Sequence, residues 1–494
     1  MNKINYFIKK ILPVLTISVF FLCSCIDLDV ESVSTITNAS MWKSEDDVNG
    51  GVNGMYVQFR NAIADNYYYA SELRSEIMNG GAGIETPYMF YYTNSLNPSS
   101  PLFTWQSFYT VVNAANLVIK NAPDISFTLE SSKNKVLAQA HAMRAFMYFM
   151  MTRTWGDLII HTDPVESTGA DVIYRERSPQ ADVFRLIKDD IDKAIQLFPD
   201  NSFPSGRCFW SIPATYALKA DVYLWTGKRM NGGDADINVA LQALQEVARA
   251  DVDLLPEFGD IFQYDNKGNK EIVMVCRYQD VESGNNYGWR MWIHPGYYDP
   301  NELDEEAIEL LTREPGRGYF MLTDHFRNQF EPGDTRKKVT FYELNNINAV
   351  GNLNSVCLKM SGFVRGGIRY FVNDIILYRY ADILLLIAEA KNALGQDPSA
   401  EINLVRERAY QENYASHIYT NDTREKNDEA ILQERLLELA TEGGRWWDLI
   451  RFDKAFDLVP SLQDKKGQNH YLLFPITTDV LSLEHNVRQN PGWD

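Results

Sequence analysis

The residue with the clearest chemical role in this sequence is Cys25. Three lysines precede an apolar run at residues 11–22, and Cys23-Ser24-Cys25 follow it. A charged segment, a short apolar segment and a small-residue exit are the parts of a secretory signal peptide. The leucine and two small residues before Cys25 predict that its thiol is lipidated before cleavage. Two alternatives are lipidation at Cys23, which follows the bulky Phe20-Phe21-Leu22, and an ordinary signal peptide with a coincidental cysteine.

Lipidation at Cys25 divides the N-terminus into two segments. Residues 1–24 are the predicted signal peptide, and the polar residues 25–38 are the predicted tether. The apolar run is too short for a transmembrane helix, which needs about 20 residues. A diacyl or triacyl anchor holds a protein firmly, whereas one acyl chain binds a membrane only marginally. Cleavage and lipidation leave Cys208, Cys276 and Cys357, whose wide spacing indicates buried small residues rather than disulfides or a zinc site.

The motifs of common enzymes are missing from this sequence. It has seven histidines and lacks H-E-x-x-H, G-x-S-x-G and a phosphate-binding glycine loop. A glycosidase needs two carboxylates across a cleft, and sequence spacing alone cannot show them. The run from Asp265 to Glu271 gathers acids, amides and a glycine, but its spacing does not fit an EF-hand and a solvated turn explains it better. We therefore predict no enzyme activity, no cofactor and no metal site.

Charge and composition narrow the choice of partner. The formal net charge of −19 argues against nucleic acid and anionic lipid. Aromatic residues make up 13% of the chain, and their flat apolar faces suit sugar rings or peptide side chains, although most aromatics pack in the core.

Helical patterns recur along the chain. Ser44 followed by three acids predicts a helix start, and the periodicity extends through Phe59. Further helices are expected at 135–155, 179–198, 214–225, 237–250, 376–394 and 398–409, with breaks at Thr226-Gly227 and Gly395. A strand is expected at 271–275.

Helix, glycine-containing break and helix is the pattern of tetratricopeptide-type repeats. The repeats are degenerate, and long irregular insertions at about 63–105 and 252–375 separate them. We expect a mainly α fold: a tetratricopeptide-like helical-repeat scaffold with long irregular insertions and a few short strands. The boundaries divide the body into an N-terminal helical region, 39–251, and a C-terminal region, 252–494, with ligand-facing insertions, since binding residues concentrate in insertions on a rigid scaffold.

Short phrases distributed along the mature chain carry a family resemblance. They are Trp42 with Asn53-Gly54-Met55-Tyr56, Trp105 with Tyr109 and Ala115-Asn116, residues 144–149 with Trp155-Gly156-Asp157, Asp334-Thr335-Arg336, residues 378–390, Asn403-Leu404-Val405-Arg406, residues 434–440, residues 444–449, and Phe474-Pro475-Ile476 with Gln489-Asn490-Pro491-Gly492. In order and spacing they resemble the SusD/RagB family of outer-membrane nutrient-binding lipoproteins of Gram-negative bacteria. The resemblance covers nearly the whole mature chain.

The resemblance implies a role at the cell surface. A member of this family is lipid-anchored in the outer membrane, exposed outside the cell, and partnered with a SusC-like TonB-dependent transporter. The expected ligand is an oligosaccharide. Peptide capture, as in the RagB branch, and a structural lid with little affinity of its own are the alternatives.

The resemblance also implies which segments contact the ligand. Tyr67-Tyr68-Tyr69 with Glu72, Arg74 and Glu76 resembles the family segment whose charged side chains face the ligand. Aromatics follow at residues 88–92 and 289–298, the two regions from which family sites draw their rings. The predicted ligand-binding residues are Arg74, Glu76, Tyr91, Tyr92, Trp289, Trp292 and Tyr297.

The strongest C-terminal motif has a structural interpretation instead. Trp446, Trp447 and Leu449 have helical spacing and lie beside Glu442, Arg445 and Asp448. This pattern predicts a core that contains buried ion pairs, whose loss costs several kcal/mol.

Overall fold

A computed structural model describes residues 41–100, 104–166, 174–311, 316–344 and 355–493. The chain divides into two units, Met1–Lys43 and Ser44–Asp494, and the description below concerns the second unit. Cys25, the predicted signal peptide and the predicted tether lie outside the described residues. Within the described residues, every helix is too short or too polar to cross a membrane.

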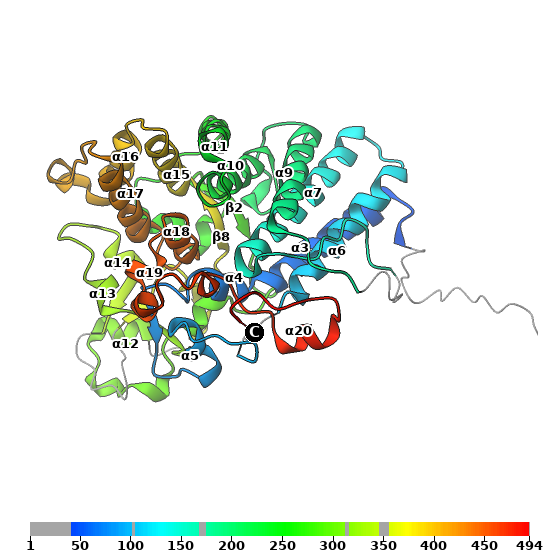
Figure 1. The fold of residues 1–494 in the computed structure, drawn as a ribbon. Coiled ribbons are helices and arrows are strands. Elements are labelled where there is room, and N and C mark those ends of the chain that lie inside the picture. Colours follow the sequence, from blue (N-terminus) through cyan, green and yellow to red (C-terminus); the bar gives the residue numbers. More distant parts are fainter. Residues whose placement is uncertain (1–40, 101–103, 167–173, 312–315, 345–354, 494) are drawn as a thin grey trace, which may run out of the picture. The chain divides into compact units, whose positions relative to one another are not determined.

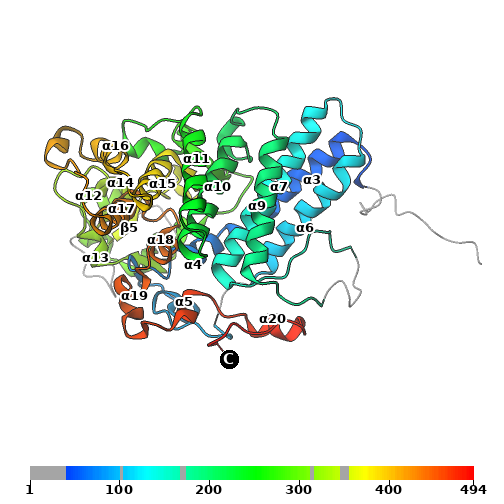
Figure 2. The same ribbon diagram turned by 45° about the horizontal axis from the view of Figure 1, so that its top comes forward.

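Paired helices form the scaffold, as predicted. Its members are α3 (Glu45–Ile63), α6 (Gln106–Asn121), α7 (Glu130–Trp155), α9 (Gln180–Leu197), α10 (Ile212–Arg229), α11 (Gly233–Ala248), α15 (Tyr380–Ala393), α16 (Ser399–Tyr410), α17 (Arg424–Leu439) and α18 (Arg445–Arg451). Helices that follow one another in this series pack together, and Figure 2 shows α7, α9, α10 and α11 side by side. The mainly α, tetratricopeptide-like architecture is therefore confirmed.

Local sequence signals set several helix boundaries correctly. Ser44 caps α3, and its hydroxyl accepts a hydrogen bond from the Asp47 amide while the Asp47 carboxylate bonds the Ser44 amide. This reciprocal pair satisfies amide groups that the first helical turn leaves free. Near the C-terminus, Gly395 adopts a φ of +72° where α15 ends, a conformation that glycine adopts without strain.

Two predicted boundaries are wrong. Helix α10 continues through Gly227 to Arg229, because this glycine provides room for helix packing rather than a break. A methyl group at Gly227 would lie 2.6 Å from the side chain of Ile237 on α11. The apolar run expected to be one helix begins instead as strand β8 (Ile375–Arg379), which pairs antiparallel with β2 (Ile272–Cys276) before α15 starts.

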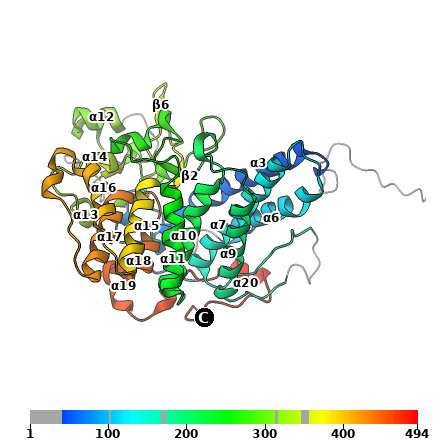
Figure 3. The ribbon, with the colours of Figure 1, turned by 90° about the horizontal axis from the view of Figure 1, so that it is seen from above.

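The insertions carry short elements. They contain α4 (Asn66–Ser71), β1 (Met78–Gly80), α5 (Thr86–Tyr92), α12 (Glu305–Leu311), β3 (Phe320–Leu322), α13 (Asp324–Arg327), α14 (Lys337–Thr340), β4 (Phe341–Glu343), β5 (Ser355–Cys357), β6 (Phe363–Arg365) and β7 (Ile368–Tyr370), and α19 (Ala455–Leu458) and α20 (Thr478–Leu483) follow the scaffold. The described strands form four antiparallel pairs, β1 with β3, β2 with β8, β4 with β5 and β6 with β7. Figure 1 shows α12, α13 and α14 below α16 and α17, and Figure 3 shows β6 and α12 on the opposite side from α19.

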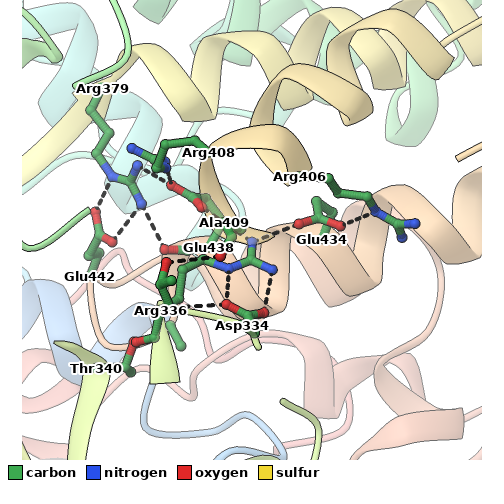
Figure 4. A network of polar contacts seen from close by, with 12 residues as sticks. Asp334, Arg336, Thr340, Arg379, Arg406, Arg408, Ala409, Glu434, Glu438 and Glu442 are labelled. Atoms are coloured by element: carbon green, nitrogen blue, oxygen red, sulfur yellow. Dashed lines mark hydrogen bonds and ion pairs between the residues drawn. The ribbon is translucent and has the colours of Figure 1, made fainter. Parts of the chain in front are cut away.

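A buried ion-pair network joins the C-terminal helices to the strands (Figure 4). Arg379 on β8 donates to Glu442 at 2.7 Å and to Glu271 at 2.8 Å, and it also bonds Glu438 on α17. Arg336 lies 2.6 Å from Glu434 and makes a two-point contact with Asp334. Both arginines are fully buried. We call this set the ion-pair network: Glu271, Asp334, Arg336, Arg379, Arg408, Glu434, Glu438 and Glu442.

The arginines of the ion-pair network keep Glu438 ionised. Burial raises the pKa of Glu438, but Arg408, Arg379 and Arg336 lower it more, so the net pKa lies well below its usual range. The predicted buried charges around the tryptophan pair are also observed. Trp446 and Trp447 are buried, and Arg445 donates to the Glu76 carboxylate at 2.6 Å and 2.8 Å.

Candidate functional site

Three chain segments form a platform for the candidate site. Strand β1 pairs with β3, and the pairing continues through hydrogen bonds from the Gly81 amide to Tyr319 and from the Gly83 amide to Gly318, both 2.8 Å. On its other side, residues 316–319 bond residues 289–292: the Arg317 amide donates to Trp289 at 2.9 Å and the Tyr319 amide to Arg290 at 2.8 Å. Backbone hydrogen bonds therefore join the two aromatic insertions into one surface.

Glycines let these segments approach one another. A methyl group at Gly81 would lie 2.3 Å from the Gly318 carbonyl oxygen, and one at Gly83 would lie 2.1 Å from the Arg317 carbonyl oxygen. Gly83 also lies under the ring of Tyr297, and Gly80 lies under the hydroxyl end of Tyr92. Only a residue without a side chain fits at these positions. The glycines therefore fix the positions of the Tyr92 and Tyr297 rings.

Arg290 is the centre of the surface. Its guanidinium contacts both carboxylate oxygens of Asp65, at 3.0 Å and 2.5 Å, and donates to the Tyr88 hydroxyl at 3.0 Å. Its centre lies 5.0 Å from the Trp289 ring and 5.5 Å from the Tyr319 ring. Burial lowers the pKa of Arg290, but Asp65 raises it more, so this side chain stays charged. A two-point contact of this kind holds the guanidinium in one orientation.

Trp289 is one of the partly exposed rings that could hold a flat ligand, and its inner side packs against the core cluster around Trp292. It is partly exposed, with the guanidinium of Arg317 4.9 Å from its ring. Arg317 is exposed, and within the described residues it forms no ion pair, in contrast to Arg290. We call the following residues the aromatic surface: Tyr88, Tyr92, Trp289, Arg290, Tyr297, Arg317 and Tyr319, of which Tyr319 is buried and supports the others.

A second acidic group lies at the edge of the aromatic surface. The Tyr319 hydroxyl donates to Glu85, and the Tyr88 and Tyr319 rings lie 4.9 Å apart. Burial, reinforced by Glu85, raises the pKa of Tyr319 to about 12, so its hydroxyl remains a hydrogen-bond donor at neutral pH. The surface thus combines ring faces with charged and hydroxyl groups.

Of the seven predicted site residues, the structure places three on this surface. Tyr92, Trp289 and Tyr297 are partly exposed and belong to the aromatic surface. Arg74, Glu76, Tyr91 and Trp292 are buried, so in this conformation they cannot touch a ligand. Residues from both predicted segments do come together, since Arg290 bonds Asp65 and Tyr88.

The four buried residues have packing roles instead. Arg74 donates to Asn94 at 2.8 Å and lies 4.3 Å from the Trp446 ring, and burial lowers its pKa to about 9. Glu76 pairs with Arg445, as described above. Trp292 lies edge to face with Phe371, with ring centres 5.7 Å apart. The Tyr91 ring lies 5.9 Å from the ring of Phe474, so tertiary contacts hold all four side chains.

The predicted ligand-binding residues did not include four members of the aromatic surface, Tyr88, Arg290, Arg317 and Tyr319, or Asp65, which holds Arg290. Asp65 and Arg290 are separated by 225 positions, and no local spacing connects them. The one available signal was the run Gly316-Arg317-Gly318-Tyr319, in which glycines alternate with large residues. Glycines at such spacing indicate a segment that another backbone approaches closely.

The suggested calcium segment has other partners. Glu271 is fully buried and accepts hydrogen bonds from Arg379 and Arg408, and the Asn269 side chain bonds the turn backbone. Across the part of the chain that the structure describes, there is no group of three or more His, Cys, Asp or Glu side chains suited to a metal ion. Cys208, Cys276 and Cys357 are free and buried, as the sequence indicated.

Comparison with known proteins finds relatives that match most of the chain. A family model described as starch-binding associating with outer membrane matches residues 28–224, and the SusD family model matches residues 366–468. SusD-like protein P38 of Formosa agariphila is 29% identical, over 93% of this chain and 94% of that protein.

Solved structures agree with the sequence matches. NanU of B. fragilis is 31% identical, with a TM-score of 0.81 over 94% of this chain and all of NanU. Surface glycan-binding protein A of Bacteroides thetaiotaomicron, solved in complex with laminarihexaose, shares the fold at 18% identity, with a TM-score of 0.72 over 91% of this chain and all of that one. The chain belongs to the SusD family.

Proposed function

We propose that this protein captures an oligosaccharide on its aromatic surface and delivers it to a SusC-like TonB-dependent transporter. In this proposal a lipid on Cys25 anchors the protein in the outer membrane, with residues 25–38 as the tether and the body exposed outside the cell. The proposal is binding without turnover.

The observation that carries the proposal is the partly exposed Trp289 on the platform of backbone hydrogen bonds. Arg317, which forms no ion pair within the described residues, lies against its ring, and Tyr297 packs on Gly83 and Gly318 of the same platform. A pyranose presents C–H groups that pack on an aromatic face. Its hydroxyls lose water on binding and need charged or hydroxyl partners in return. The aromatic surface supplies both in one place, with little rearrangement because glycine contacts hold the rings.

Membership of the SusD family also supports an oligosaccharide ligand. The matched model is described as starch-binding and associating with the outer membrane, and the distant structural relative noted above was solved with laminarihexaose. Both findings concern glycans, which favours an oligosaccharide over a peptide as the first ligand to test. The transport partnership also belongs to this proposal, as does the division of the body into an N-terminal helical region, 39–251, and a C-terminal region, 252–494, with ligand-facing insertions.

Isothermal titration calorimetry of the mature protein against matched panels of oligosaccharides and peptides tests the ligand class. We expect binding to at least one oligosaccharide and loss of at least tenfold in affinity in Trp289→Ala and in Tyr297→Ala. Tyr216→Ala is the matched control, since Tyr216 is a partly exposed aromatic residue on α10 outside the aromatic surface. If the protein binds only peptides, its ligand is a peptide and the glycan proposal is wrong. If it binds neither panel, the structural-lid alternative is supported.

Anchoring is tested separately. Cys25→Ala should move the protein from the membrane fraction to the soluble fraction while its calorimetric affinity stays unchanged. If this variant stayed in the membrane fraction, the lipid assignment would be contradicted, but the ligand proposal would be unaffected.

A further inference from the structure

A small cavity lies where α4, α7, α10 and α18 meet. Its volume is about 60 Å³, and its lining includes Tyr67 from α4, Arg153 from α7, Asp221 from α10 and Trp447 from α18. These four side chains are at most about a tenth exposed. The cavity is distinct from the aromatic surface, and the proposed function assigns it no role.

Three polar atoms around this cavity have no hydrogen-bond partner among the residues that the structure describes. They are the indole Nε1 of Trp447, the guanidinium Nε of Arg153 and the carboxylate Oδ1 of Asp221. The other carboxylate oxygen of Asp221 does accept hydrogen bonds, from Arg153 Nη1 at 3.3 Å and from the Tyr378 hydroxyl at 3.2 Å. Asp221 Oδ1 lies 3.5 Å from Arg451 Nη1 in an ion pair but accepts no hydrogen bond among the described residues. Buried polar groups are nearly always hydrogen-bonded, so three such atoms around one cavity indicate a bound species.

The three atoms together determine which hydrogen-bonding groups the bound species must have. Trp447 and Arg153 offer hydrogens and need an acceptor, which a metal cation cannot be. Asp221 offers lone pairs and needs a donor, which a simple anion cannot be. Four arginines and four carboxylates line the cavity, so its formal charge is zero and it favours a neutral occupant. A small neutral molecule that both donates and accepts fits all three atoms.

We propose that this cavity is a binding site for a cluster of ordered water molecules that bridge Trp447, Arg153 and Asp221. A water needs roughly 10–15 Å³ of such space and two to four polar partners, so the cavity has room for about four. The Arg153 guanidinium lies between the rings of Phe149 and Trp447, 3.7 Å and 3.8 Å away, so water can reach it only at its edge. The waters complete the hydrogen bonding that the protein leaves open.

The cluster lies under the helix that supports the aromatic surface. Tyr67 packs edge to face on Trp447, with ring centres 5.7 Å apart, and lines the cavity. On the same short helix, Tyr69 lies 5.9 Å from the guanidinium centre of Arg290, and Asp65 immediately before it holds that guanidinium. The waters therefore help to fix the position of α4.

A crystal structure at about 1.5 Å resolution tests the site directly. We expect ordered waters within hydrogen-bond distance of Trp447 Nε1, Arg153 Nε and Asp221 Oδ1. Trp447→Phe removes the indole donor and should displace the water bound to it. Trp210→Phe is the matched control, because Trp210 is buried and its indole nitrogen also lacks a partner, but it does not line this cavity. The control should keep every cavity water.

A second measurement needs no substitution. Crystals pressurised with xenon should show no xenon in this cavity, since hydrated polar cavities exclude it whereas dry apolar ones take it up. Xenon occupancy, an empty cavity at high resolution, or a bound ion in place of waters would each overturn the proposal.

Discussion

The aromatic surface and the ion-pair network use the same residue types for opposite purposes. In the network, Arg379 is fully buried and bonds three glutamates. In the aromatic surface, Arg317 is exposed beside Trp289, and the described residues offer it no ion pair. A buried charge that loses its partners is very costly, whereas an exposed one is free to bind a ligand. Burial, rather than residue type, separates the structural arginines from the ones available for binding.

This comparison also explains why the strongest sequence motifs contain residues that stabilise the fold and not residues that bind a ligand. The most regular phrases in the chain, residues 334–336, 378–390 and 434–449, supply most of the ion-pair network or pack next to it. The residues of the aromatic surface come from the long insertions between the scaffold helices. Strong motifs in this protein therefore identify its scaffold.

The largest effect is expected from Arg379→Ala. This change leaves Glu271, Glu438 and Glu442 buried with fewer counter-charges, which costs about 3–5 kcal/mol of unfolding free energy. Urea unfolding followed by far-UV circular dichroism measures it. Arg379→Lys, which keeps the charge, should recover part of the loss. An unfolding free energy within about 1 kcal/mol of the wild type would show that the network does not stabilise the fold.

A smaller loss is expected from Arg445→Ala. Arg445 has one carboxylate partner, Glu76, and its removal leaves that buried carboxylate unpaired, at a cost of about 3 kcal/mol. A double-mutant cycle with Glu76→Gln measures the coupling between the two residues. Additive effects of the two changes would contradict a direct pair.

Acid sensitivity should depend on Glu389. Burial raises its pKa, but Arg451 and Lys228 lower it more, to about 2 from an ordinary 4.5. Because the folded-state pKa is depressed, this stabilisation is fully present above pH 4.5 and is lost as the pH falls toward 2. The drop corresponds to roughly 3 kcal/mol. In Glu389→Gln, the unfolding free energy should fall less steeply between pH 4.5 and 2 than in the wild type; equal slopes would refute the assignment.

The smallest effect is expected at the edge of the network, from Arg406→Ala. Arg406 is about a fifth exposed and pairs with Glu434 at 2.7 Å. Solvent screens such a pair, and Glu434 keeps Arg336 as a partner, so the loss should stay under about 1 kcal/mol. A loss as large as that of Arg379→Ala would show that burial does not rank these contacts.

The sequence predicted the scaffold better than the site. Caps such as Ser44 and stops such as Gly395 act within one helical turn, so local patterns locate them. The run from Ile375 onward is apolar throughout, and only its pairing with β2 shows that it begins as a strand. The roles of Arg74 and Arg290 depend on contacts hundreds of residues away, with Tyr471 and Asp65, which local spacing cannot reveal.

The most direct test measures affinity and stability together in two variants, Trp289→Ala and Arg445→Ala. Calorimetry with an oligosaccharide that the wild type binds gives the affinity, and urea unfolding gives the stability. We predict that Trp289→Ala loses at least tenfold in affinity while it stays folded, and that Arg445→Ala loses stability while the folded protein keeps its affinity. A Trp289→Ala variant that binds normally, or an Arg445→Ala variant that folds normally but loses the ligand, would contradict this account.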